Sequence, residues 1–107
     1  MTRVVIQRRG AEIVGISTSG HSGYAEAGSD IVCAAVSSAT RLTINALTEI
    51  VKVSGQLMLD EEEPKLGFLL DSTENQMAQI FLQAYQLEME QIAAEYPKYM
   101  EVIRMEA

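Results

Sequence analysis

The sequence of 107 residues contains a single cysteine, Cys33, and a single histidine, His21. One cysteine excludes an internal disulfide, which agrees with a reducing compartment and leaves the thiol available for chemistry. Together the two residues supply only two of the four soft ligands that a structural metal site usually has. We therefore expect neither a metal nor another cofactor.

Long apolar runs are missing as well. No uninterrupted apolar stretch approaches the roughly 18 residues of a membrane span, and the first residues lead into a strand-like pattern rather than a signal peptide. We expect no membrane association and a cytoplasmic location. Internal repeats and low-complexity linkers are absent, and an apolar content of 48% is enough for a core. Residues 1–107 are therefore predicted to form one domain.

Basic residues are scarce, with 8 lysines and arginines against 15 aspartates and glutamates, for a net charge of −7. Domains that bind nucleic acids usually display a basic face, so direct contact with nucleic acid is not expected. An acidic surface favours a basic protein partner, although solubility alone also explains it. The chain also lacks the nucleophile elbow of serine hydrolases and the glycine-rich loops that bind phosphates.

The chemically informative stretch runs from Gly20 to Ser37, with the sequence GHSGYAEAGSDIVCAAVS. Ser29 and Asp30 are both good N-cap residues, and an apolar run follows them at once. Either cap places Cys33 near the third or fourth position of a helix. There the free backbone N–H groups and the positive end of the helix dipole favour the thiolate, which is the nucleophilic form.

His21 precedes Cys33 by twelve residues, in a segment punctuated by Gly20, Gly23 and Gly28. The glycines let the segment turn sharply and move over a bound peptide. An imidazole beside a thiol can accept its proton and later protonate a leaving amine. On spacing alone the alternative stays open that Cys33 is a small buried hydrophobic residue and His21 a polar loop residue.

Ser37 lies one helical turn after Cys33, and Arg41 lies one turn further, so the three side chains are expected to line up on one face. Ser37 could donate a hydrogen bond to the thiolate or bind substrate. Close packing at a helix crossing explains a serine there equally well.

Strand patterns occur in three places. Residues 3–19 predict a hairpin with its turn at Arg9-Gly10, and residues 56–60 and 65–71 predict a second hairpin with an acidic turn. Residues 99–106 alternate between two faces and predict a last strand.

Two long helices are predicted between these strands. The first should run from about residue 30 to residue 54 and end at Gly55, and its broad apolar surface suggests burial against the sheet and against a second helix or another subunit. Thr73 and Gln76 have capping-box spacing at the start of the second helix, which Pro97 should end. The order ββαββαβ predicts an α+β fold, an α/β sandwich with two helices on one antiparallel or mixed sheet.

The segment GHSGYAEAGSDIVCAAVS resembles the signature of the ribosomal-processing cysteine protease (Prp) family, in which a Gly-His pair precedes a loop and an Asp-apolar-apolar-Cys-Ala-Ala run. The resemblance implies a homodimeric cysteine endopeptidase that removes a short N-terminal extension from the precursor of large-subunit ribosomal protein twenty-seven. It implies His21 and Cys33 as a catalytic dyad, with Gly20, Asp30 and Ser37 in supporting positions. A different class of function stays open, a non-catalytic binding module for ribosome assembly whose cysteine is structural.

Overall fold

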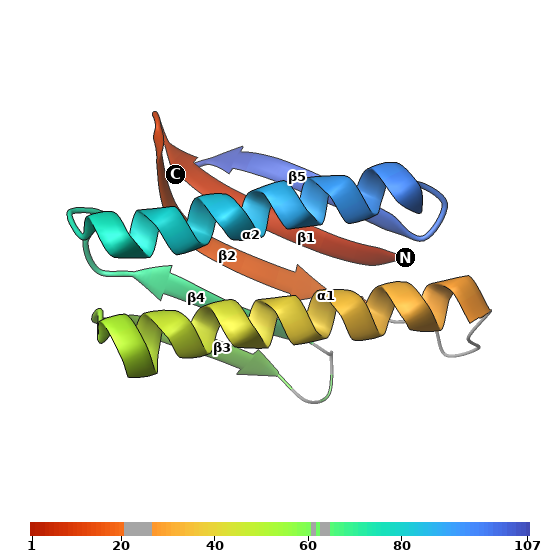
Figure 1. Ribbon diagram of the computed structural model, residues 1–107, viewed down its shortest axis with the longest axis horizontal. Helices are drawn as coiled ribbons and strands as arrows, with labels where there is room; N and C mark the ends of the chain where they lie inside the picture. Colours follow the sequence, from red (N-terminus) through yellow and green to blue (C-terminus); the bar gives the residue numbers. More distant parts are fainter. Residues whose placement is uncertain (21–26, 61, 63–64) are drawn as a thin grey trace.

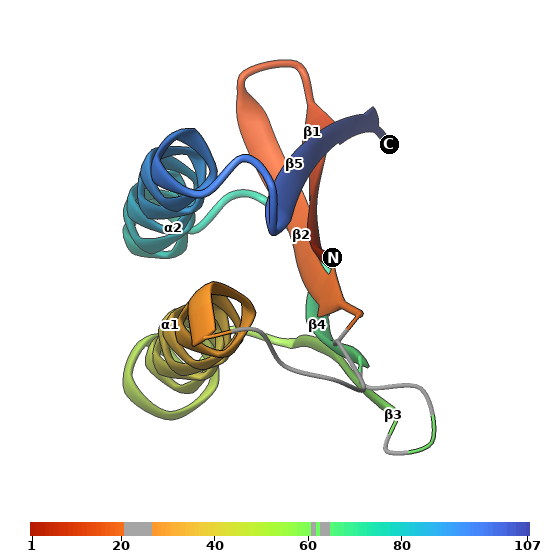
Figure 2. The ribbon, with the colours of Figure 1, turned by 90° about the vertical axis from the view of Figure 1, so that its right-hand side faces the viewer.

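Two helices lie side by side on one face of a five-stranded sheet (Figures 1 and 2). The computed structural model describes residues 1–20, 27–60, 62 and 65–107. The elements are, in chain order, β1 (Thr2–Arg9), β2 (Glu12–Ser19), α1 (Ala27–Asn45), a π-helical turn η1 (Ala46–Val51), β3 (Gly55–Asp60), β4 (Lys65–Leu70), α2 (Gln76–Glu95) and β5 (Met100–Glu106).

The strand order across the sheet is β3-β4-β2-β1-β5. Both hairpins are antiparallel, β2 pairs antiparallel with β4, and β5 runs parallel to β1, so the sheet is mixed. The predicted α+β class, the order ββαββαβ and the placement of both helices on one face are confirmed. In the part of the chain that the structure describes, the other face of the sheet carries no helix, as Figure 2 shows edge-on.

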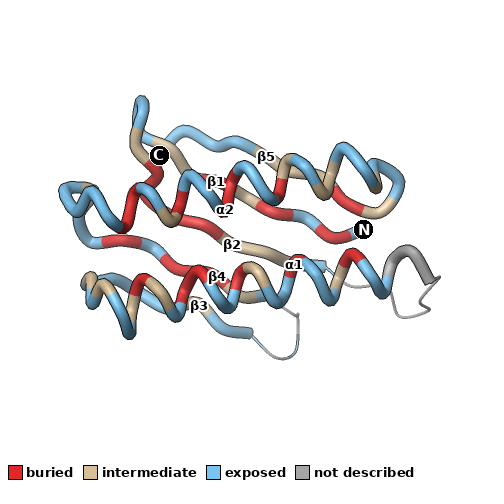
Figure 3. Tube along the Cα trace, in the orientation of Figure 1, coloured by how far each residue is buried: buried red, intermediate tan, exposed pale blue. Residues whose placement is uncertain are grey.

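The core fills the space between the helices and the sheet, where the buried positions of both layers face each other (Figure 3). Burial raises the pKa of Tyr85 to about 12. Thr40 donates its hydroxyl proton to the Val36 carbonyl at 2.7 Å, so Tyr85 is the donor in its own 2.7 Å contact with Thr40. This bond ties α2 to α1 inside an apolar layer.

The first hairpin turns at Gly10, as predicted, and Gly10 has a φ of +62° that favours glycine. The register shifts between Gln7 and Arg8, which marks a β-bulge. Near the bulge, the Gln79 side chain of α2 accepts a hydrogen bond from Ile13 N–H and donates one to Ile13 C=O, both at 2.8 Å. The buried amide of Gln79 therefore satisfies both backbone groups of a strand residue.

The helix ends differ from the predicted ones. The first helix was expected to run to about residue 54 and end at Gly55, but η1 ends at Val51, and its C-cap Lys52 adopts the left-handed conformation with a φ of 65°. The N–H groups of Lys52 and Val53 both donate to Leu47 C=O and close this end. Gly55 instead begins β3, where a Cβ atom would run into Leu69 C=O and the Phe68 ring.

The predicted capping box of the second helix is wrong. Asn75 is the N-cap of α2, and its side chain accepts a hydrogen bond from Ala78 N–H at 2.9 Å. Thr73 lies two residues before the cap, and Gln76 is the first helical residue. Asparagine caps as well as threonine does, and only the backbone conformation decides between two such residues so close together.

Residues Asp30–Val51 are long and apolar enough to cross a membrane by length and composition, with a mean hydropathy of 1.3. Helices that pack on the core of soluble proteins pass the same test, and this segment lies along the sheet (Figure 1). The absence of membrane association stays a prediction.

Candidate active site

Cys33 is half-buried on α1, between the core side of the helix and solvent. Its neighbours Val32 and Val36 are fully buried, and Leu42, on the opposite side of the helix, is 72% exposed. Successive helical residues are rotated by about 100°, which places Cys33 at the edge of the buried stripe. The amino-terminal part of α1, which carries Cys33, extends past the end of β2 (Figure 1).

The predicted position of Cys33 within the helix is wrong. Helix α1 begins at Ala27, so Cys33 is its seventh residue rather than its third or fourth. The first helical turn, where free N–H groups and the dipole favour an anion, is occupied by residues before Cys33. The helix start therefore does not by itself explain an activated thiol, and any activation depends on a neighbouring side chain.

Asp30 is likewise not the N-cap. It lies within α1, in its first turn, and its side chain is exposed. A carboxylate in the first turn interacts favourably with the helix dipole, so Asp30 can still stabilise the helix that carries Cys33. Its place in a catalytic site stays a prediction.

Gly20 is required by the backbone. It follows β2 directly, its φ of +88° is one that other residues rarely adopt, and a Cβ atom would run into the Met1 carbonyl. Gly20 immediately precedes His21 in the sequence, so this constraint fixes the backbone at the last described residue before the histidine.

His21 itself, the remainder of the segment up to residue 26, and its predicted mobility lie outside the described residues. The His21–Cys33 dyad therefore stays a prediction. Ser37 lies one turn beyond Cys33 and Arg41 one turn beyond Ser37, and both side chains are exposed. A serine packed at a helix crossing would be buried, so the exposure of Ser37 disfavours that alternative. Donation to the thiolate and substrate binding both stay predictions.

A groove runs beside the helix that carries Cys33. It has a volume of about 460 Å³, lies between α1–η1 and the β3–β4 hairpin, and is lined by Arg41, Ile44, Asn45, Thr48, Glu49, Leu57, Leu59 and Leu66. The sequence analysis predicted the hairpin but assigned no binding role to its leucines. The alternation in QLMLD was the available signal, because it places Leu57 and Leu59 on one face of a strand.

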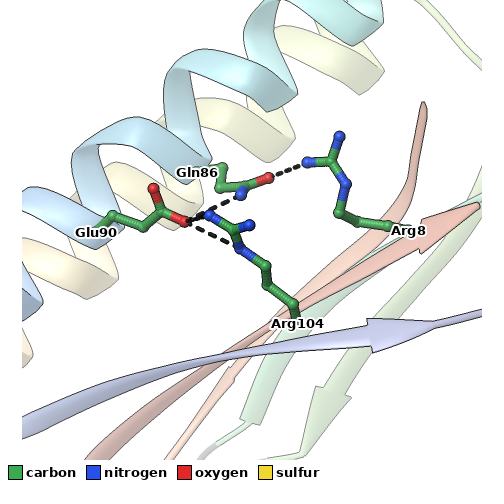
Figure 4. Close-up of polar contacts among 4 residues, drawn as sticks. All are labelled: Arg8, Gln86, Glu90 and Arg104. Atoms are coloured by element: carbon green, nitrogen blue, oxygen red, sulfur yellow. Dashed lines mark hydrogen bonds and ion pairs between the residues drawn. The ribbon is translucent and has the colours of Figure 1, made fainter. Parts of the chain in front are cut away.

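A cluster of polar side chains lies between α2 and the strands β1 and β5 (Figure 4). Arg8 donates to the Gln86 side chain, and Gln86 and Arg104 both donate to Glu90. Hydrogen bonding from Arg104, and then from Gln86, lowers the pKa of Glu90 against the smaller opposing effect of its burial. The cluster is a bridge between α2 and the sheet.

Within residues 1–20, 27–60, 62 and 65–107, no three histidine, cysteine, aspartate or glutamate side chains gather as a metal site would require. The predicted absence of a metal or other cofactor is not tested by this observation and stays a prediction.

Comparisons with known proteins place these features in a family. The family model described as "Cysteine protease Prp" matches residues 1–101. SMU.848 from Streptococcus mutans has a similar structure, with a TM-score of 0.89 and 26% identity over 100% of this chain and 96% of that one. The comparison with curated protein sequences finds no match.

Two crystal structures of the essential ribosomal processing protease Prp from S. aureus share the fold. The complex with a substrate peptide has a TM-score of 0.89 and 23% identity, and the complex with a covalently linked product peptide has a TM-score of 0.85 and 24% identity. Each match covers 97% of this chain and 99% of the other. Because the family model spans nearly the whole chain, this protein belongs to the cysteine protease Prp family and is a cysteine protease.

Proposed function

We propose that the protein is a cytoplasmic ribosomal-processing endopeptidase that removes the N-terminal extension of large-subunit ribosomal protein twenty-seven. The family match over residues 1–101 carries this proposal, because it includes both His21 and Cys33. The likeness to an S. aureus enzyme with substrate and product peptides supports it. The net charge of −7 suits a basic ribosomal substrate. A non-catalytic binding module is set aside by the family assignment.

In the proposed mechanism, His21 accepts the proton of Cys33, and the thiolate attacks the carbonyl carbon of the scissile bond. The tetrahedral intermediate collapses to a thioester as the C–N bond breaks, and the imidazolium gives its proton to the leaving amine. Water then attacks the thioester with His21 as the base. The acid is released and the thiol is restored.

The test is incubation of the protein with the ribosomal protein precursor, followed by mass measurement of the product. Cys33→Ala should abolish cleavage and keep the unfolding midpoint close to that of the wild type, because the side chain is small and only half-buried. Ser38→Ala is the matched control, since it truncates an exposed residue of the same helix. Turnover by Cys33→Ala at the wild-type rate, with contamination excluded, would remove Cys33 from the mechanism.

We further propose that the protein acts as a homodimer. Its interface would cover the outer face of the helical layer, which is the face of α1 and α2 that points away from the sheet. Between α1 and α2 lies an open groove of about 270 Å³, lined by Ala39, Leu42, Thr43, Ala46, Phe81, Ala84, Tyr85 and Glu88. Large apolar side chains are exposed on the two helices and η1, among them Leu42 (72%), Ile50 (75%), Ile80 (59%) and Leu87 (57%). Exposed apolar surface of this extent is typical of an interface.

Leu42→Lys tests this interface. The side chain is largely exposed in the single chain, so the charge should leave the fold intact and shift the protein to the monomer in sedimentation experiments. Leu69→Lys, on the helix-free face of the sheet, is the control and should leave the mass unchanged. A wild-type monomer at high concentration would contradict the dimer and leave the protease assignment intact.

A further inference from the structure

A hydrogen bond between two buried side chains joins the helices, which lie side by side on the sheet (Figure 2). The Tyr85 hydroxyl of α2 donates to the Thr40 hydroxyl of α1 at 2.7 Å, and Thr40 donates to the Val36 carbonyl of its own helix at 2.7 Å. Both side chains are buried. Both hydroxyl protons are therefore used, and the chain of bonds that begins at α2 ends on the backbone of α1.

Tyr85 belongs to a helix whose place on the sheet is fixed by polar contacts. Helix α2 is hydrogen-bonded to the strands on both sides of this residue, by Gln79 to β2 and by Glu90 to β5. The described side chains of α1, residues 30–45, form no hydrogen bond with a strand in the part of the chain that the structure describes. The bond from Tyr85 is therefore a directional contact that locates α1 against the anchored helix.

Thr40 lies almost in line with the thiol on α1. With about 100° of rotation and 1.5 Å of rise per residue, Thr40 lies about 20° around the helix axis and about 10 Å along it from Cys33. The Val36 carbonyl, on which the chain of bonds ends, belongs to the stretch between them. A threonine hydroxyl that bonds to the carbonyl four residues earlier often bends a helix, and the threonine side chain divides between two rotamers in helices.

We infer that Tyr85, acting through Thr40, is a positioning residue of the protease, which sets the place of the Cys33 thiol in the active site. The inference rests on the proposed function, in which Cys33 is the nucleophile. The bond from Tyr85 holds Thr40 in the rotamer that reaches Val36, and thereby fixes the direction of the helical turns that carry the thiol.

The size of the effect follows from how far a helix can shift. Helices held by packing move against each other by about 1–2 Å in conformational transitions. A misplacement of about 1 Å can cost a reaction about 10² in rate. A hydrogen bond that suppresses such shifts is therefore expected to matter more for the reaction than for folding.

The test exploits the single cysteine, because iodoacetamide then labels one site. The alkylation rate measured against pH gives the pKa of the Cys33 thiol, since the thiolate is the reactive form. Tyr85→Phe keeps the ring and leaves no buried donor without an acceptor, so the variant should fold. It should raise the midpoint of the alkylation profile by about one pH unit, toward the ordinary thiol pKa of about 8.5.

The same variant should slow cleavage of a synthetic peptide that spans the cleavage site of the ribosomal protein twenty-seven precursor. We expect kcat to fall by about tenfold with little change in KM, because the thiol is displaced while the peptide still binds. Thr40→Val should act in the same way. Thr40→Ser keeps the hydroxyl and should restore both the wild-type alkylation profile and the wild-type kcat.

Thr43→Val is the matched control. It removes a hydroxyl about one turn further along α1, which bonds only to the Ala39 carbonyl of the same helix, and it should leave the alkylation profile and kcat unchanged. A purely structural role for the Tyr85 bond would lower the unfolding midpoint of Tyr85→Phe and leave its alkylation midpoint and its kcat per folded molecule at the wild-type values. That result overturns the inference.

Failure of the proposed function gives a different result. If the wild type leaves the precursor peptide uncut, the proposed substrate is wrong, and the alkylation profiles still decide the role of Tyr85. A wild-type alkylation midpoint at about 8.5 contradicts the dyad and the inference together. A lowered wild-type midpoint that Tyr85→Phe shares supports the dyad and contradicts the inference alone.

Discussion

The two helices lie on the same sheet but are held by different interactions. Helix α2 is tied to the strands by polar side chains: Gln79 bonds to the backbone of Ile13, Gln86 accepts from Arg8, and Glu90 accepts from Arg104. The side-chain hydroxyls of α1 and η1 instead donate to carbonyls of their own helix, at Thr40, Thr43 and Thr48. Apolar packing holds α1 on the sheet.

The two helices therefore have different roles: α2 contributes to stability through its polar contacts, and α1 carries the proposed nucleophile. Helix α2 uses directional bonds to fix its position, so these polar and charged residues of α2 are structural. Helix α1 carries Cys33, and beside it the edge strand leaves a groove. Substitutions of Cys33 and of exposed residues near it should therefore alter turnover with little effect on folding, and substitutions in the α2 bridges should do the reverse.

The largest expected effect is on the cleavage rate, when the proposed general base is removed. His21→Ala should lower the cleavage rate by about 10²–10⁴, the usual contribution of acid–base catalysis, and leave the unfolding midpoint unchanged. Histidine is the side chain whose ordinary pKa lies nearest neutrality, so the pH–rate profile should lose a step near neutral pH in the variant. Ser22→Ala, at the next residue, is the control. A His21→Ala enzyme with the wild-type rate and profile would show that Cys33 acts with another base.

The next largest effect is expected on stability, from a substitution in α2. Gln79→Ala leaves both backbone groups of Ile13 without their partner in a buried position, and each unpaired group costs about 1–3 kcal/mol unless water replaces the amide. We expect a clear loss of unfolding free energy in urea and normal turnover per folded molecule. Gln83→Ala removes an exposed glutamine one turn later and should change neither quantity. Equal stability of the two variants would contradict the role given to Gln79.

The sequence predicts which helices and strands form better than it predicts where each helix begins and ends. Alternating apolar residues and turn chemistry identify both hairpins, because these signals are local. The start of α1 was missed because Gly28 disfavours a helix, yet the helix continues through it to Ala27. The left-handed Lys52 was missed because nothing in its side chain favours that conformation over the glycine three residues later.

The other features that the sequence did not predict depend on contacts between residues far apart in the chain. Arg8 and Gln86 are separated by 78 positions, so no pattern within one element predicts their hydrogen bond. Leu57 and Leu59 could be assigned to one face of a strand from their spacing, but only the strand order shows that β3 is at the edge beside α1. The candidate nucleophile, in contrast, could be named from the sequence because the chain holds one cysteine.

The smallest expected effect is electrostatic and lies in the α2 bridge. The pKa of Glu90 is lowered in the folded protein, chiefly by the hydrogen bond from Arg104, so the carboxylate stabilises the fold above its unfolded pKa. That contribution is lost as the pH falls through the lowered, folded-state pKa. Glu90→Gln keeps the side chain's shape and one acceptor oxygen and removes the charge.

The side chains of Arg104 and Glu90 are 63% and 35% exposed, so solvent screens the pair and the effect at neutral pH should be below about 1 kcal/mol. Unfolding midpoints of the wild type and Glu90→Gln should differ at pH 7 and in low salt, and the difference should shrink in acid and in high salt. Glu95→Gln removes the same charge from an exposed position of the same helix outside the cluster and serves as the control. A difference in unfolding midpoint that stays constant from pH 7 into acid would show that Glu90 acts through its shape rather than its charge. In that case Glu90 would hold α2 on the sheet by packing, as the apolar side chains hold α1.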